Sequence, residues 1–249
     1  MSVAAQPAVG QTDRSEAERS VGPAAERELD LRAYYEDSGE RFRCVPEFDP
    51  RELVRVGLVF RLMPRRPGRS ALDVGCGDGF LCEQLAGRGF KTVVGVDLAS
   101  SRLAYARDRR PQGQFAQSDI NRLPFADGQF DTVTCIDVLE HQLDPVQAFR
   151  ELARVSRRYV ICKTPYREAL PANLCPYCRR SFPPDGHLHS FDEDRFQRMA
   201  DAAGMRLLRW KHGHPMFEYR RFRYCPPLRW LIAGYYRDSG FIGGLFEKD

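Results

Sequence analysis

The chain has 249 residues, of which 43% are hydrophobic and 29% charged, so it can bury one sizeable core with appendages but not a second full domain. Its formal net charge of +4 does not favour a surface built for the phosphates of nucleic acid. Because the sequence shows neither an apolar run of membrane-spanning length nor the basic-then-apolar start of a secretion signal, we expect a cytoplasmic protein.

The N-terminal part is predicted to be an appendage of the core. Residues 1–27 mix small, polar and charged residues without apolar periodicity, so they are expected to form a disordered tail. Residues 28–68 are expected to be a helical lead-in. Within it, Asp49 and Pro50 suit the N-cap and first position of a helix that runs to Phe60.

Residues 69–249 are predicted to form one α/β domain. Apolar segments typical of buried strands alternate with amphipathic helical segments, which indicates a parallel sheet covered by helices on both faces. Asp144 and Asp192 are suitably placed to start two of these helices. The expected strands end near Val74, Asp97, Ser118, Ile136, Lys163, Trp210 and Phe246.

A glycine-rich turn follows the first strand and indicates a ligand site. Gly75, Gly77 and Gly79 alternate just before a helical segment, so bare main chain and unpaired helix N–H groups face the same place. Roughly 20 residues further on, Asp97 ends the next strand, where a carboxylate can grip a ribose diol. Phe80 occupies the position where a dinucleotide site needs a small residue. The pattern therefore favours a nucleoside ligand without a pyrophosphate, such as S-adenosylmethionine.

Four ordered motifs between Ala71 and Trp210 resemble the class I S-adenosylmethionine-dependent methyltransferases, especially the branch with the generic small-molecule methyltransferase domain. The motifs are Leu72–Gly79, Val94–Asp97, Gln117–Ile120 with Leu123–Phe125, and Phe130–Val133 continuing to Leu139–His141. The resemblance implies a Rossmann-like sheet of seven strands that is mostly parallel and ends in an antiparallel hairpin.

The resemblance also implies roles for individual residues around S-adenosylmethionine. The implied assignments are Asp73, Gly75 and Gly77 at the methionine end, Asp97 and Leu98 at the ribose, Asp119 and Ile120 at the adenine, and Asp137 at the mouth of the fourth strand.

An insertion after the fifth strand, residues 166–190, contains residues with metal-binding chemistry. Cys175 and Cys178 have C-x-x-C spacing, and His187 and His189 would lie on the same side of an extended segment. These four residues predict a structural zinc site, in which Asp185 is an alternative to one histidine. In the competing interpretation the cysteines are plain thiols, and the histidines face the substrate or cap the next helix.

His141 is the candidate catalytic residue. Methyl transfer is an in-line displacement that needs alignment of the acceptor and exclusion of water, and a base is needed only when the acceptor must lose a proton. His141 follows the fourth strand and supplies an imidazole close to the inferred methyl group. Alternatively, it packs on the cofactor or orients Asp144.

We expect a methyltransferase that acts on an oxygen or nitrogen of a small molecule. One alternative is a tRNA or other RNA methyltransferase, for which the arginine-aromatic segment 217–224 could stack bases. A second alternative is a protein that binds S-adenosylmethionine without catalysis. The acceptor and the oligomeric state cannot be predicted from these motifs, since acceptor pockets in this fold are formed by variable insertions.

Overall fold

The computed structural model describes residues 31–41, 50–170, 172–174, 179, 181–182, 186–213 and 240–248. The predicted tail 1–27, the pair Cys175 and Cys178, and segment 217–224 lie outside the described residues. Among those described, no helix combines the length and apolar character that crossing a bilayer requires.

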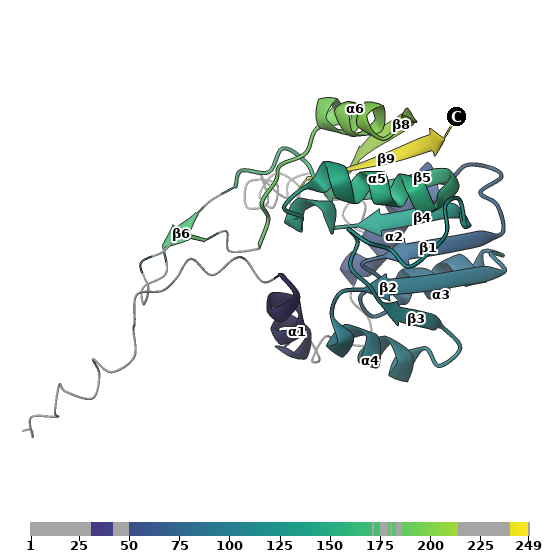
Figure 1. Cartoon of the computed structure of the whole chain (residues 1–249), viewed down its shortest axis with the longest axis horizontal. Helices are drawn as coiled ribbons and strands as arrows, with labels where there is room; N and C mark the ends of the chain where they lie inside the picture. The colour runs from purple at the N-terminus through teal and green to yellow at the C-terminus, as the bar shows by residue number, and fades with distance from the viewer. Residues whose placement is uncertain are drawn as a thin grey trace, which may run out of the picture.

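The core of the molecule is a seven-stranded sheet with the strand order β3-β2-β1-β4-β5-β9-β8 (Figure 1). The first five strands along this order run parallel, while β9 is antiparallel to both β5 and β8. Both the mostly parallel sheet and its antiparallel final hairpin are as predicted. The strands are β1 (Ser70–Val74), β2 (Thr92–Asp97), β3 (Gln114–Gln117), β4 (Phe130–Ile136), β5 (Ser156–Pro165), β8 (Met205–Gly213) and β9 (Phe241–Lys248).

Helices cover both faces of this sheet because each presents one apolar stripe to it. On one face, helices α2 (Pro50–Leu62) and α3 (Phe80–Gly87) contribute Leu58 and Leu85 to a cluster that also holds Ile161 of β5. On the other face, helices α5 (Pro145–Val155) and α6 (Glu193–Ala202) pack with β9. There, the rings of Phe149 and Phe196 lie 4.7 and 5.5 Å from that of Phe246.

The two predicted helix starts are confirmed. The carboxylate of Asp144 accepts hydrogen bonds from the backbone N–H groups of Val146 and Gln147, each at 3.0 Å, and Pro145 begins α5. At α6, Asp192 accepts from the backbone of Arg195 at 2.8 Å. These caps satisfy N–H groups that the helix itself leaves unpaired.

The insertion after β5 contains a two-stranded ribbon that the sequence did not predict. Strand β6 (Asn173–Leu174) pairs antiparallel with β7 (Ser181–Phe182), and β6 stands away from the main sheet in Figure 1. Residues 186–190 return to the sheet, where Leu188 N–H donates to the carbonyl of Glu140 at 2.7 Å. Only this second part of the insertion is therefore shown to reach the carboxyl edge of the parallel strands.

Helix α1 (Leu31–Arg41) closes one side of that edge by contacting helix α4 (Ser100–Arg109). The Glu36 carboxylate accepts from the backbone N–H groups of Ser100 and Ser101, at 2.8 and 3.1 Å. Glu36 thus caps the N-terminus of α4 from a helix that lies 64 residues earlier in the chain.

The docking of α1 is expected to weaken in acid. Burial disfavours the charged form of Glu36, but the hydrogen bonds from Ser100 and Ser101 outweigh it, so the pKa of Glu36 lies below its ordinary value. The pKa of Glu36 is therefore lower in the folded protein than in the unfolded chain. The stabilisation is fully present above the pKa of the unfolded chain, and it is lost as the pH falls through the pKa of the folded protein. We expect amide protection of residues 31–41, measured by hydrogen exchange, to fall selectively below about pH 4.

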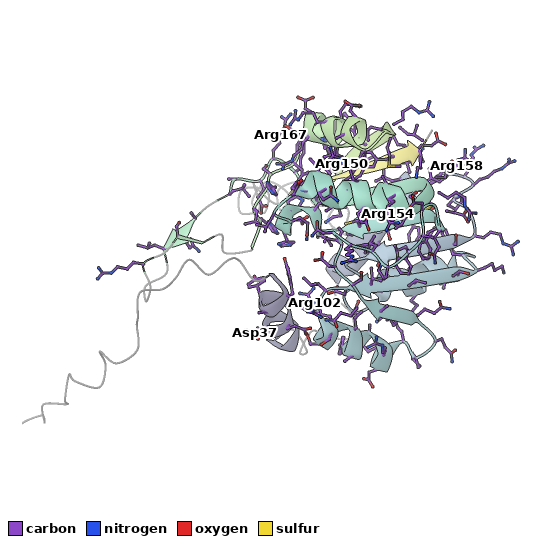
Figure 2. All side chains as sticks on the ribbon, viewed as in Figure 1. Asp37, Arg102, Arg150, Arg154, Arg158 and Arg167 are labelled. Carbon is purple, nitrogen blue, oxygen red and sulfur yellow. The ribbon has the colours of Figure 1, made fainter. Side chains whose placement is uncertain are left out.

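The variant Glu36→Gln should show weakened protection of α1 already at neutral pH. Asp37→Asn is the matched control, because Asp37 is exposed on the same helix (Figure 2). Equal protection of α1 in all three proteins across this pH range would show that Glu36 does not hold the helix.

Candidate active site

The predicted glycine turn lies at the carboxyl end of β1 and has the backbone that its sequence requires. Gly75, Gly77 and Gly79 have φ of 78°, 53° and 80°, in the left-handed region that favours glycine. The N–H groups of Gly75 and Cys76 donate to the carbonyl of Val96 at 2.8 and 2.9 Å, which fixes the turn on β2. A Cβ on Gly77 would meet no atom within 4 Å, so its main chain is open to a ligand.

Asp97, at the end of β2, is placed against this turn. Its Oδ2 accepts from the N–H of Gly77 at 2.9 Å, and its Oδ1 accepts from that of Ala99 at 3.0 Å. The side chain is buried. A carboxylate has about four acceptor positions, so each oxygen can still accept from a hydroxyl. Next to it, the carbonyl of Leu98 accepts from the Gln117 side chain at 2.8 Å.

Asp73 supports the turn from within the sheet. Its carboxylate is 3% exposed and accepts from the hydroxyl of Thr134 at 2.7 Å and from the thiol of Cys82 at 3.8 Å. A hydrogen bond to Cys82, together with burial, raises the pKa of the Cys76 thiol. Cys76 and Cys82 are thus buried thiols, as expected, and so are Cys135 and Cys162.

The residues predicted to surround an adenine lie just after β3. Asp119 is exposed, and its Oδ1 accepts from the backbone and side-chain nitrogens of Asn121 at 2.8 and 3.0 Å. Ile120 is 6% exposed and packs in the same core cluster as Val74 and Val96. The structure therefore offers a polar and an apolar side chain next to each other, at the same edge as Asp97.

Asp137, at the end of β4, has a partner that the sequence did not suggest. Both of its carboxylate oxygens accept from the ammonium of Lys163 on β5, at 2.6 and 2.7 Å. Asp137 has a φ of 54°, an uncommon conformation for a residue other than glycine. The ion pair holds this bend in place beside the mouth of the sheet.

His141 closes a short 3₁₀ helix, η2 (Leu139–His141), that follows this bend. Its Nδ1 lies 3.0 Å from the carbonyl oxygen of Gly186. Since a carbonyl only accepts, Nδ1 must carry the proton and Nε2 the lone pair. Burial lowers the pKa of His141 to about 4, so the ring is neutral at physiological pH. The Tyr35 ring covers it edge-on at 5.6 Å.

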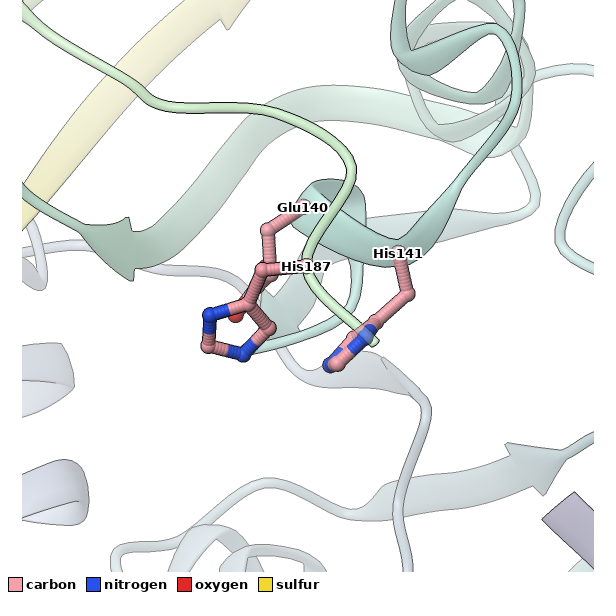
Figure 3. A group of neighbouring side chains, drawn as sticks. All are labelled: Glu140, His141 and His187. Carbon is pink, nitrogen blue, oxygen red and sulfur yellow. The ribbon is translucent and has the colours of Figure 1, made fainter. Parts of the chain in front are cut away.

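The structure gathers His141 with its chain neighbour Glu140 and with His187 from the insertion. The ligating atoms of Glu140, His141 and His187 all lie within 4.8 Å of one another, and the rings of the two histidines are 4.7 Å apart. Figure 3 shows Glu140 and His141 coming from η2 and His187 from the segment that crosses it. His189 is not in this group, and the predicted zinc site of Cys175, Cys178, His187 and His189 stays a prediction because the two cysteines are outside the described residues.

The carboxyl edge thus brings together the glycine turn, Asp97 and His141 as the motifs indicated. Sequence reasoning missed the contributions of Glu36, Glu140, Lys163 and Glu168, each of which acts through a contact with a distant segment. The pattern Glu140-His141 was the one available signal, because neighbouring carboxylate and imidazole groups after a strand indicate a polar site.

Residues 72–162 match the family model described as a methyltransferase domain. The match includes the glycine turn, Asp97, Asp137 and His141, and stops before the insertion.

Curated relatives share about half of their length with this chain. The ubiquinone biosynthesis O-methyltransferase of Paracidovorax citrulli is 36% identical over 125 residues, which cover 48% of this chain and 50% of that protein. The protein of the same name from Hahella chejuensis is 34% identical over 133 residues, 51% and 54% of the two chains. This chain therefore spans about half the length of the curated relatives it matches.

Solved structures show the same fold at low identity. An S-adenosylmethionine-dependent methyltransferase from Mesorhizobium loti has a TM-score of 0.58 and 17% identity, with 76% of this chain and 96% of that chain covered. The cyclase SpnF has a TM-score of 0.59 and 19% identity, with 78% and 79% covered. Since one of these neighbours is named as a cyclase, the fold by itself does not establish methyl transfer.

Proposed function

We propose that the chain is an S-adenosylmethionine-dependent methyltransferase that transfers the methyl group to an oxygen of a small-molecule acceptor. The observation that carries this proposal is the buried Asp97 carboxylate, hydrogen-bonded to the open main chain of Gly77 at 2.9 Å. The names of the O-methyltransferase relatives support an oxygen acceptor.

The proposed cofactor site follows the carboxyl ends of the first three strands of the fold. Gly75, Gly77 and the buried Asp73 behind them would serve the methionine end, where bare main chain is available. Asp97 and the main chain of Leu98 would bind the ribose, with Asp97 using its remaining acceptor positions for the two hydroxyls. Asp119 and Ile120 would flank the adenine, and Asp137 would border the methyl group. Bound S-adenosylmethionine supplies an electrophilic methyl group on a sulfonium.

His141 would face the acceptor through its unprotonated Nε2. In the transfer, the acceptor oxygen forms a bond to the methyl carbon, the carbon–sulfur bond breaks, and its electron pair stays on sulfur, which becomes a neutral thioether. The hydroxyl proton of the acceptor must leave. With a pKa of about 4, His141 is a weak proton acceptor by itself, because general bases work best when their pKa lies near the operating pH.

A structural zinc ion in the insertion stays part of the proposal. Cys175 and Cys178 are outside the described residues; in the sequence they fall between Leu174 and Ser181, which the structure pairs across β6 and β7. His189 could add a third ligand, since its Nε2 is buried and has no hydrogen-bond partner among the described residues. His187 lies instead beside His141, which favours Asp185 as the fourth ligand.

The variant Asp97→Asn is expected to lower the affinity for S-adenosylmethionine at least tenfold, measured by isothermal titration calorimetry. A hydrogen bond to a charged group contributes about 1.5–3 kcal/mol, and the amide cannot replace both acceptor oxygens. Asp127→Asn is the matched control, because its side chain is 80% exposed and pairs with Arg154, away from the turn. Unchanged affinity in Asp97→Asn would refute the proposed ribose contact.

The activity itself is tested by incubating the protein with methyl-labelled S-adenosylmethionine and fractionated cell extract. Label in small molecules would support a small-molecule acceptor. If the labelled products do not react with amine-directed reagents, that result would support a methyl group on oxygen, as proposed. Label in RNA would favour the RNA methyltransferase alternative. Its proposed platform, residues 217–224, lies outside the described residues, and the labelled arginines of Figure 2 are spread over α4, α5, β5 and the insertion. Binding without any labelled product would favour the non-catalytic alternative.

A further inference from the structure

The group formed by Glu140, His141 and His187 has the composition of a metal site with open coordination positions. One carboxylate and two imidazoles are a common protein ligand set for catalytic divalent cations, which use the remaining positions for water or substrate. Glu140 is fully buried, and the two histidines are partly buried. The three ligating atoms lie within 4.8 Å of one another.

This spacing is somewhat wider than one ion requires. Two ligands on opposite sides of an ion with bonds of about 2.1 Å lie about 4.2 Å apart, and adjacent ligands lie closer. Adjacent ligands of a tetrahedral ion lie about 3.4 Å apart, so atoms up to 4.8 Å apart would have to approach by up to about 1.4 Å to share an ion. Glu140 and His141 come from η2, whereas His187 comes from the insertion segment that crosses it (Figure 3).

The outer contacts of the two histidines match those of metal-binding imidazoles, which usually donate their second N–H to a carbonyl or a carboxylate. His141 Nδ1 donates to the carbonyl of Gly186 at 3.0 Å. His187 Nδ1 lies 2.5 Å from Oε2 of Glu168. Both contacts leave Nε2 as the atom with the lone pair in the neutral ring. Two independently anchored imidazoles thus offer lone pairs next to one carboxylate.

We propose that Glu140, His141 and His187 bind one divalent cation, and that this cation holds the acceptor oxygen during methyl transfer. Glu168 is the positioning residue that fixes the ring of His187. The Glu140 carboxylate supplies negative charge to the site, and its charge helps to raise the pKa of Tyr35, after burial and Tyr34. A cation between three electron-pair donors removes the mutual repulsion of those donors.

The proposed ion provides a route by which the acceptor hydroxyl can lose its proton without a general base. This step rests on the proposed function. A hydroxyl oxygen bound to the cation has a lower pKa and releases its proton to bulk water, because the ion stabilises the alkoxide or phenolate charge. The oxygen then attacks the methyl carbon as described above, with no oxidation or reduction. His141 acts in this scheme as a ligand rather than as a base.

The binding test uses the full chain, freed of metal by chelation and titrated with Co²⁺, which takes the same nitrogen, oxygen and sulfur ligands as Zn²⁺. The double variant Cys175→Ser/Cys178→Ser removes the cysteine site of the insertion. In that background we expect one equivalent of Co²⁺ to bind without the near-ultraviolet thiolate-to-cobalt band. Adding Glu140→Gln or His187→Ala should weaken binding at least tenfold, and Glu168→Gln about tenfold.

His212→Ala is the matched histidine control. Its ring pairs with Glu193 at 2.9 Å and packs on Tyr166, so Co²⁺ binding should stay unchanged. Glu140 is buried, so circular dichroism must show that Glu140→Gln is folded. If that variant is unfolded, His187→Ala alone decides the result, because the side chain of His187 is 19% exposed and its loss is easier to tolerate. Loss of all Co²⁺ binding in the double cysteine variant, or binding that survives His187→Ala, would overturn the proposal.

Failure of this proposal can be separated from failure of the proposed function. Calorimetry with S-adenosylmethionine on the chelated protein tests the cofactor site alone, since the carboxylate of Asp97 is held by the N–H groups of Gly77 and Ala99. Cofactor binding without Co²⁺ binding refutes only the cation. Co²⁺ binding without cofactor binding refutes the methyltransferase.

Discussion

Replacing Gly75 with alanine should both destabilise the protein and remove most of its affinity for S-adenosylmethionine. A Cβ at this position would lie 2.2 Å from Cγ2 of Val138, far inside van der Waals contact. The left-handed φ of 78° costs an L-residue about 1–2 kcal/mol, and overpacking adds about 1–3 kcal/mol. We therefore expect the free energy of unfolding, measured by urea denaturation, to fall by about 2–5 kcal/mol.

The loss of affinity has a separate cause. Val138 directly precedes η2, so a side chain at position 75 pushes on the segment that carries Glu140 and His141. At the same time, the turn can no longer keep the N–H of Gly77 on Asp97. We expect the dissociation constant for S-adenosylmethionine to rise at least tenfold at a temperature where the variant is fully folded.

Two further variants separate the steric effect from the conformational one. Gly75→Ala/Val138→Ala removes Cγ2 of Val138, the atom that the new Cβ would overlap. This double variant should recover the stability lost to overpacking, but not the stability lost to the left-handed backbone. Gly87→Ala, at the end of α3, is the control: a Cβ there meets nothing within 4 Å, and alanine favours the helix. If Gly75→Ala is as stable as Gly87→Ala, the backbone at Gly75 does not lie as close to Val138 as the structure shows.

The parts of this molecule that were predicted correctly are those that depend on neighbours in the sequence. The turn at Gly75 and Gly77 needs glycine because of its own backbone angles. Asp144 and Asp192 cap helices that begin one residue later. The parallel arrangement of the first five strands could be inferred because strands and helices alternate along the chain, although the antiparallel hairpin came from family resemblance.

The contacts that shape the candidate site could not be predicted in this way, because they join segments with no fixed sequence separation. Glu36 reaches Ser100 across 64 residues, and Lys163 reaches Asp137 across 26. The zinc hypothesis grouped His187 with His189 from their two-residue spacing. That grouping stays a prediction, whereas the contact of His187 with His141 is one the sequence could not indicate: the hydrogen bond from Leu188 to Glu140 brings the insertion back to η2.

The ion pair between Asp137 and Lys163 should make the largest single electrostatic contribution to the candidate site. The side chains of Lys163 and Asp137 are only 8% and 23% exposed. Removing one partner of a buried pair costs about 3–5 kcal/mol, because the other charge is left without compensation. We expect Lys163→Met and Asp137→Asn each to lower the free energy of unfolding by up to this amount, with the smaller loss for Asn, whose oxygen still accepts one bond.

The double variant Lys163→Met/Asp137→Asn should recover at least half of the loss, since it leaves no unpaired charge, and asparagine tolerates the φ of 54°. A double-mutant cycle from urea denaturation measures the coupling, and losses that simply add would show that the two groups do not interact. Arg158→Met is the control, because it breaks an exposed pair with Glu247 that should contribute no more than about 1 kcal/mol.

The same variants test whether the pair also serves catalysis. Asp137 directly follows β4 and Val138 directly precedes η2, so the ion pair fixes the direction in which Glu140 and His141 leave the sheet. If that positioning matters, the double variant should bind S-adenosylmethionine nearly as well as the parent chain but turn over at least tenfold more slowly, because the acceptor is misaligned. A folded double variant with unchanged turnover would restrict the pair to a structural role, and the direction of η2 would then have to be fixed by the contacts of Gly186 and Leu188 instead.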